Sequence, residues 1–225
     1  MKMANTIFLK TYDPPIYDKT EILRYAGVRS ELPQLEPLVL ECMDEAADKF
    51  TYNVCYGVFP VMQRGDMLDL GFAEVRSKSL SKNLDGCCTA VVFAATVGIG
   101  IDRLIARYGN ISPTKSLLFQ AIGAERIESL CDAFNRDITQ DAAQHEMFTR
   151  PRFSPGYGDV PLSLQTDIFR TVDCQRKLGL TLNSSLLMSP SKSVTAIIGI
   201  GKNKGSELSG CAVCTKKDCS FKRKS

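Results

Sequence analysis

A single amphipathic stretch, from Pro113 to about Gln144, constrains the fold of this 225-residue chain more than any other feature. Leucine, alanine and isoleucine recur along it at spacings of three and four, with charged residues on the opposite face. This pattern predicts one long α-helix. Its length exceeds that of a usual globular helix, so we expect a kink near Gly123.

The segments around this helix predict both strands and further helices. Residues 88–97 (CTAVVFAATV) form a continuous apolar run, which is typical of a buried central strand. Two segments rich in strand-forming residues, 52–61 and 67–75, flank Gly65 and Asp66 and predict an antiparallel pair. Closing strands are expected over 181–188 and 193–200, joined by a turn around Pro190.

Shorter helices are predicted from apolar spacing and from capping residues. Thr20 is the expected cap of the first, and Gly179 the expected end of the last. The expected ranges are 20–27, 33–50, 79–84, 101–109 and 164–178. Because strands and helices mix without strict alternation, the fold class is predicted as α+β, with a mixed, mostly antiparallel twisted sheet and long helices.

Charge and hydropathy exclude several classes of protein. The net charge of +3 is too small to indicate a nucleic-acid-binding protein, and no RNA-binding signature accompanies the basic residues. No apolar run is long enough to cross a bilayer, and the N-terminus lacks the apolar core of a secretory signal. We therefore expect a cytoplasmic protein without a membrane partner. The single histidine, His145, is expected to be structural or exposed rather than catalytic.

Nine cysteines in such a chain indicate a reducing compartment rather than a disulfide framework. Six of them lie scattered, mostly among apolar neighbours, where cysteine behaves as a small hydrophobic residue. The other three, Cys211, Cys214 and Cys219, form a C-x2-C-x4-C array near the C-terminus. Thiols this close together predict a zinc site or an iron–sulfur cluster. A fourth ligand would come from Cys174, a partner or a small molecule, and the alternative is a tail of free thiols.

A loop crowded with proline and glycine follows the long helix, over residues 150–163 (RPRFSPGYGDVPLS). Long loops inside a domain are often functional. Arg152 offers a planar fork of donors suited to a carboxylate, and Tyr157 offers an aromatic face and a hydroxyl. Pro155, Gly156 and Gly158 favour a turn that a ligand can approach closely. By composition alone, a surface connection between two helices is the favoured explanation of the loop, and the composition does not identify a ligand.

The order of residues here resembles the activation domain of cobalamin-dependent methionine synthase. That family carries an Arg-x-x-Pro-Gly-Tyr loop, a helix, a Gly-(Met/Leu)-x-Leu-(Thr/Asn)-x-Ser segment, and a Met-x-Pro turn before a Ser-Val strand. The resemblance covers about residues 115–200, including the helical stretch AIGAERIESLCDAF. The matching positions are Arg152, Pro155, Gly156 and Tyr157; Gly179 with 180–184; Met188 and Pro190; and Ser193 with Val194.

The resemblance implies a binding site for S-adenosylmethionine. Arg152 would bind the methionine carboxylate, the backbone at Ser154 would contact the ligand, and Tyr157 would line its adenosyl side, with Pro155, Gly156 and Gly158 shaping the loop. An acid of the long helix, Glu128 or Glu125, would lie near the ammonium group; the alternative is that both face solvent. Asp159 has no counterpart in the family pattern, and the chain diverges from it after Gly201.

The implied function is that of an accessory subunit, one that holds S-adenosylmethionine for reductive methylation of the cobalamin of a methionine synthase or related corrinoid protein. No side chain would be catalytic, and the system would need an electron donor. We expect an activation-domain-like unit over residues 1–205 and a cysteine-rich tail over 206–225. Two alternatives stay open: a small-molecule methyltransferase that uses S-adenosylmethionine, and a metal- or corrinoid-binding interaction module.

Overall fold

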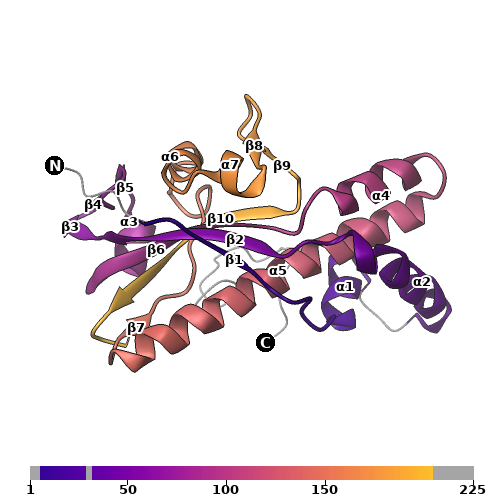
Figure 1. Ribbon diagram of the computed structural model, residues 1–225, viewed down its shortest axis with the longest axis horizontal. Coiled ribbons are helices and arrows are strands. Elements are labelled where there is room, and N and C mark those ends of the chain that lie inside the picture. The colour runs from indigo at the N-terminus through magenta and orange to yellow at the C-terminus, as the bar shows by residue number, and fades with distance from the viewer. Residues whose placement is uncertain (1–5, 29–31, 205–225) are drawn as a thin grey trace.

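The computed structural model describes residues 6–28 and 32–204 and is built around a five-stranded antiparallel sheet (Figure 1). The strand order is β1-β2-β6-β10-β7, so the longest strands lie at the centre. Their bounds are β1 Phe8–Thr11, β2 Asn53–Pro60, β6 Cys87–Thr96, β10 Ser193–Gly201 and β7 Phe148–Thr149. The expected central strand over 88–97 is confirmed as β6, which pairs with β2 on one side and with β10 on the other.

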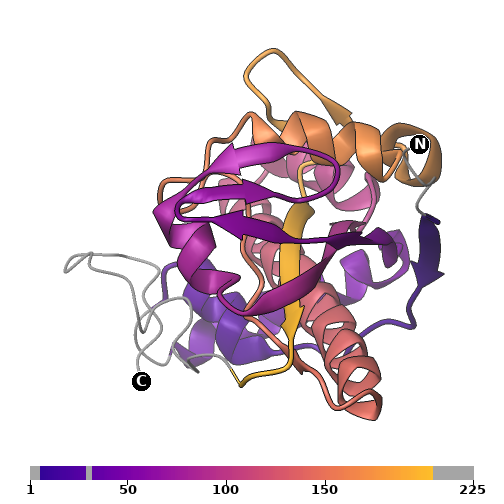
Figure 2. The same ribbon diagram turned by 90° about the vertical axis from the view of Figure 1, so that its left-hand side faces the viewer.

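Both faces of the sheet are covered, which explains why β6 is continuously apolar from Ala90 to Ala95. Val91 and Phe93 point into a core shared with the long helix, whereas Ala90 and Val92 point into a second core on the opposite face. Successive residues in this central part of β6 alternate between two apolar environments, so both faces of the strand are apolar there. Figures 1 and 2 show the long helix on one side of the sheet and two short helices with a small sheet on the other.

The first layer contains the long helix, α5, which spans Pro113–Gln144 as predicted. It packs against three other helices, α1 Lys19–Tyr25, α2 Glu36–Ala46 and α4 Gly100–Gly109. Short 3-10 turns, η1 Pro33–Leu35 and η2 Ala47–Lys49, flank α2. Gly123 lies where α5 meets α4: a Cβ there would lie 3.1 Å from Ile101 Cγ1 and 3.0 Å from Lys192 Cγ. Gly123 therefore allows close packing between α5 and α4. The kink expected there does not interrupt α5, which continues across Gly123 as one helix.

The second layer contains shorter elements. They are α3 Lys78–Asn83, a three-stranded sheet of β3 Met62–Arg64, β4 Met67–Asp69 and β5 Glu74–Arg76, the helices α6 Leu164–Thr171 and α7 Cys174–Leu178, and a hairpin of β8 Thr181–Leu182 and β9 Met188–Ser189. In Figure 1, α6, α7 and this hairpin stand together on the side of the sheet opposite α5.

Two of the predicted strand arrangements were wrong in detail. The segments 52–61 and 67–75 do not pair along their length: β2 pairs with β1 and β6, and only the short β3–β4 hairpin surrounds Gly65 and Asp66. The expected strand over 181–188 is a hairpin with only two residues in each arm. In the first case the pairing of β2 depends on partners that are distant in the chain rather than on local β-propensity.

Two helix predictions also needed correction. The helix expected over 164–178 is broken into α6 and α7 because Asp173 adopts a left-handed conformation, with φ of 54°. The cap of α1 is Asp18, whose carboxylate accepts the Glu21 N–H, and not Thr20. Gly179 ends α7 in a left-handed conformation, as expected.

The predicted fold class, α+β with a mostly antiparallel sheet and long helices, is confirmed. Among the helices of the described residues, none is long and apolar enough to cross a membrane. The predicted division into 1–205 and 206–225 remains a prediction, since the second part lies outside the described residues.

Candidate functional site

The segment that carries Arg152 follows β7 and runs beside β10, the strand that lies between β6 and β7 in the sheet. After β7, the Arg150 N–H donates to Gly199 O at 2.8 Å, and Phe153 exchanges two backbone hydrogen bonds with Ile197. Neighbouring residues of such an extended segment point to opposite faces. Phe153 accordingly packs into the second core, and Arg152 extends toward α5.

Arg152 holds two carboxylates of α5 at once. Its Nη2 donates to Glu128 Oε2 and its Nη1 to Asp132 Oδ1, each at 2.5 Å. The two acids are four residues apart and therefore share one face of the helix. The exposed fractions are 21% for the Arg152 side chain, 36% for Glu128 and 45% for Asp132. The cluster is therefore open to solvent, and a ligand can reach it.

Glu125, the other acid predicted to contact a ligand, is buried inside the protein and already has partners there. Its side chain is 2% exposed and pairs with Arg126, which is fully buried. Glu125 Oε1 also accepts the Ser129 hydroxyl at 2.7 Å and the Asp18 N–H at 3.3 Å. Of the two candidates, only Glu128 lies beside Arg152 with a partly exposed carboxylate.

Arg126 anchors the segment that precedes α1. Its two Nη atoms donate to Pro15 O and Ile16 O, at 2.5 Å and 2.9 Å, and its guanidinium lies 3.9 Å from the centre of the Tyr17 ring. Burial raises the pKa of Tyr17 to about 12, so its hydroxyl stays protonated at neutral pH. These contacts fix the start of α1 against α5 and so define one wall of the site.

A groove of about 310 Å³ lies between α1 and α5, next to the Arg152 cluster. Its lining is strongly acidic, with five carboxylates and one aromatic ring; the residues are Asp18, Glu21 and Tyr25 from the α1 side and Glu125, Glu128, Ser129 and Asp132 from α5. The guanidinium groups paired with these acids are those of Arg24, Arg126 and Arg152. The carboxylates therefore outnumber the guanidinium groups, and the groove favours a cationic ligand.

The α1 residues and Asp132 were not predicted from the sequence. Asp132 carried one usable signal, its spacing of four residues from Glu128 on a predicted helix. Nothing local places Asp18, Glu21 or Tyr25 near the loop, because α1 and α5 are about a hundred residues apart in the chain. Only their packing brings them together.

The rest of the predicted loop forms a compact turn. The Tyr157 N–H donates to Ser154 O, and the Gly156 N–H donates to Val160 O. Pro155 is buried, whereas the Tyr157 ring is 70% exposed. Gly158 has φ of 56°, and a Cβ there would lie only 2.7 Å from Ser79 Oγ, so this position requires glycine.

Asp159, whose role was open, fixes this turn to α3. Its carboxylate accepts the Ser77 hydroxyl and the backbone N–H groups of Lys78 and Ser79, the last two at 2.8 Å and 3.1 Å. The hydrogen bond from Ser77 is the main reason why the pKa of Asp159 lies well below its usual range. Asp159 therefore positions the loop.

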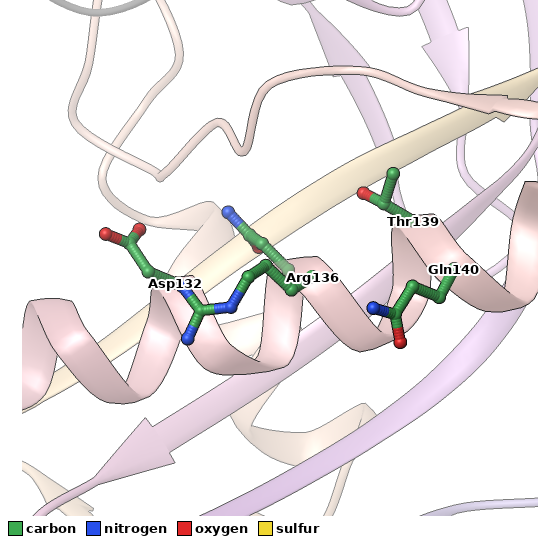
Figure 3. Close-up of a pocket in the computed structure, with 5 residues that line it drawn as sticks. Asp132, Arg136, Thr139 and Gln140 are labelled. Carbon is green, nitrogen blue, oxygen red and sulfur yellow. The ribbon is translucent and has the colours of Figure 1, made fainter. Parts of the chain in front are cut away.

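A second hollow, of about 450 Å³, lies farther along α5 and is lined by Asp132, Asn135, Arg136, Thr139 and Gln140 (Figure 3). Figure 3 shows its labelled side chains extending from one helix. Asp132 belongs to both hollows and links this surface to the Arg152 cluster. No residue of the loop over 150–163 lines this second hollow.

The remaining predictions concern histidine and cysteine. His145 is exposed at the end of α5, as expected. Cys174 is fully buried beside Cys55, and the hydrogen bond with Cys55 raises the pKa of its thiol. Within 6–28 and 32–204, no group of three or more histidine, cysteine or acidic residues is placed to hold a metal. The predicted ligands Cys211, Cys214 and Cys219 lie outside these described residues.

No protein-family model and no curated protein matches the chain. Among solved structures, the chain is similar to the reactivation domain of MetH, crystallised with bound AdoHcy. The TM-score is 0.61 over 88% of this chain and 79% of that one, with 13% sequence identity. At this identity the similarity establishes a shared fold.

Proposed function

We propose that the chain binds S-adenosylmethionine between α1, α5 and the Arg152 loop, and presents its methyl group to the corrinoid of a methionine synthase or related protein. The observation that carries the proposal is the cluster of Arg152 with Glu128 and Asp132. A free α-amino acid end has one carboxylate and one ammonium group. A guanidinium next to two partly exposed acids offers a partner for each.

Binding would proceed by exchange of ion-pair partners. The methionine carboxylate of the ligand would replace one of the two acids on Arg152, and the released acid would accept the ammonium group. Glu128 is suited to this role because it also lines the groove between the helices. The guanidinium would keep a charged partner throughout, which avoids leaving a half-buried cation unpaired.

The charge of the groove supports the same ligand. S-adenosylmethionine carries a sulfonium and an ammonium against one carboxylate, so its net charge is positive. The acidic lining of the groove attracts such a ligand. Tyr157, exposed on the loop, and Tyr25, in the groove wall, offer aromatic faces for the adenine.

The methyl transfer itself needs no base from this chain. Cobalt(I) of the partner's corrinoid would supply the electron pair, the sulfonium carbon–sulfur bond would break, and S-adenosylhomocysteine would leave. What the chain supplies is the position of the methyl group. A separate donor would provide the electron that reduces the corrinoid beforehand. The similar fold of the MetH reactivation domain, crystallised with AdoHcy, supports this role.

The alternatives are less well supported. A doubly wound methyltransferase has a parallel sheet, whereas every pairing in the main sheet here is antiparallel. A metal-binding interaction module would leave the Arg152 cluster without a role. The tail metal site at Cys211, Cys214 and Cys219 remains a prediction.

Calorimetric titration of S-adenosylmethionine into the full chain tests the proposal, with Arg152→Ala as the variant. The matched control is Arg136→Ala, an arginine of α5 that lines only the second hollow. Saturable binding that Arg152→Ala weakens and Arg136→Ala leaves unchanged supports the site. Equal binding by wild type and Arg152→Ala contradicts it. Retained binding by Arg152→Ala together with loss in Arg136→Ala would move the site to the second hollow.

A further inference from the structure

The second hollow continues the surface of α5 on which the Arg152 cluster lies. Glu125, Glu128 and Asp132 of the groove follow one another at spacings of three and four residues, and the residues of the second hollow extend this spacing along the helix. Residues so spaced share one face of a helix. An occupant of the second hollow would therefore lie directly beside a ligand bound at Arg152.

The second hollow differs from the groove in charge. The groove has five carboxylates, whereas the five residues of the hollow include one acid, Asp132, and one base, Arg136. In Figure 3 the Arg136 side chain extends along the helix toward Asp132. The other three, Asn135, Thr139 and Gln140, are neutral amides and a hydroxyl, which both donate and accept hydrogen bonds. The lining therefore favours a neutral occupant rich in hydrogen-bonding groups.

Asn135 supplies the second observation that points to an occupant. Its Oδ1 atom is buried, yet it has no hydrogen-bond partner within residues 6–28 and 32–204. A buried polar atom without a partner costs free energy, and native structures rarely keep one. Because a carbonyl oxygen only accepts, the group that would satisfy it is a donor. An N–H group of an occupant of the hollow is suited to this role.

The distance from the Arg152 cluster indicates the size of this occupant. Asn135 follows Glu128 by seven residues, and a helix rises about 1.5 Å per residue, so roughly 10 Å of helix separates them. A corrinoid is a flat macrocycle with cobalt at its centre and carboxamide side chains around its rim. When the cobalt faces a methyl group held beside Glu128, a rim carboxamide lies at a distance of this order along α5.

We propose that the second hollow binds a rim carboxamide of the corrinoid, with the amide N–H donating to Asn135 Oδ1. Thr139 and Gln140, both exposed, offer further hydrogen-bonding groups to the same rim. This contact sets the rotation of the macrocycle relative to the methyl group. The inference rests on the proposed function, because that function brings a corrinoid to this face of α5.

Binding of two free corrinoids to the full chain tests the inference. Cobinamide carries carboxamides on its rim, whereas cobyrinic acid carries carboxylates there at neutral pH. Equilibrium dialysis, followed by the absorbance of the corrin, gives the two Kd values. The wild type should bind cobinamide at least about 5-fold more tightly, because a carboxylate cannot donate to Asn135 and is repelled by the acidic groove. Equal affinities would overturn the recognition of the amides.

Asn135→Leu removes the acceptor while keeping a side chain of similar size. Cobinamide should bind to this variant about 5- to 10-fold more weakly, and the Kd of cobyrinic acid should stay the same. The Tm should not fall, because Asn135 Oδ1 accepts no hydrogen bond within the described residues. The matched control is Asn110→Leu, an exposed asparagine at the opposite end of α5. It should bind cobinamide as the wild type does.

The remaining outcomes separate this inference from the proposed function. A lower Tm of Asn135→Leu with unchanged cobinamide binding would make Asn135 a structural residue and overturn the contact. A wild-type chain that binds S-adenosylmethionine but neither corrinoid would overturn the role of the second hollow and keep the Arg152 site. A chain that binds none of the three would overturn both proposals.

Discussion

Two ion-pair clusters on consecutive turns of α5 differ in how they meet solvent. Arg126 and Glu125 are 0% and 2% exposed, and their remaining hydrogen bonds go to the segment before α1 and to Ser129. Arg152 holds Glu128 and Asp132 at the same distances, but all three are partly open to solvent. The same type of ion pair therefore stabilises packing at Arg126 and is available to a ligand at Arg152. The difference between the two clusters is their burial.

The largest change in stability is expected from disrupting the buried pair of Arg126 and Glu125. Arg126→Ala would leave Glu125 buried without its charged partner, and removing one partner of a buried pair lowers the free energy of unfolding by about 3–5 kcal/mol. Urea denaturation measures this change. Arg136→Ala, an exposed position, should stay within about 0.5 kcal/mol of wild type. Similar midpoints for the two variants would mean that the buried pair contributes little.

Removing Arg152 from the partly exposed cluster should weaken ligand binding more than it lowers the stability of the fold. Arg152→Ala removes the donor proposed for the ligand carboxylate, and hydrogen bonds to charged groups contribute about 1.5–3 kcal/mol. We expect the Kd for S-adenosylmethionine to rise by about 10- to 100-fold. Thermal denaturation of the same sample without ligand should show a smaller loss of stability than Arg126→Ala. A variant that unfolds as readily as Arg126→Ala would make Arg152 a structural residue.

Neutralising one acid in each cluster should affect ligand binding in one case and stability in the other. Glu128→Gln should weaken binding by about 10-fold with little change in stability, because one charge-assisted contact is lost at an open site. Glu125→Gln should instead lower the unfolding free energy, since Arg126 would keep its charge in a buried position without a counterion. Calorimetry and urea denaturation on both variants give the two readouts. Reversed effects would exchange the roles assigned to the two acids.

The smallest change in stability is expected at Asp159, which anchors the Arg152 loop to α3. Because the pKa of Asp159 is lower in the folded protein, its stabilisation is present above the unfolded-state pKa of about 3.9 and is lost as pH falls through the folded-state value. Asp159→Asn should therefore lower the Tm at about pH 7, and the difference from wild type should shrink below about pH 4. A difference that stays constant with pH would mean that the charge of Asp159 is irrelevant.

Part of the candidate site was predictable from the sequence. The loop from Arg152 to Gly158 and the acid Glu128 were singled out by residue type, order and resemblance, and the structure brings Arg152 and Glu128 into contact. Glu125 was an equal candidate because both acids lie on one predicted helix. Which of them turns toward the interior depends on where α1 packs, and the sequence carries no local signal for that.

The elements that can be predicted from the sequence are those whose signals are local. The apolar spacing of α5, the unbroken apolar run of β6 and the helix stop at Gly179 depend on residues that are near one another in the chain. Three features depend on tertiary packing: the position of β2 between β1 and β6, the break between α6 and α7 at Asp173, and the groove between α1 and α5. The physical reason is that periodicity sets which face of an element is apolar, whereas long-range packing sets what that face meets.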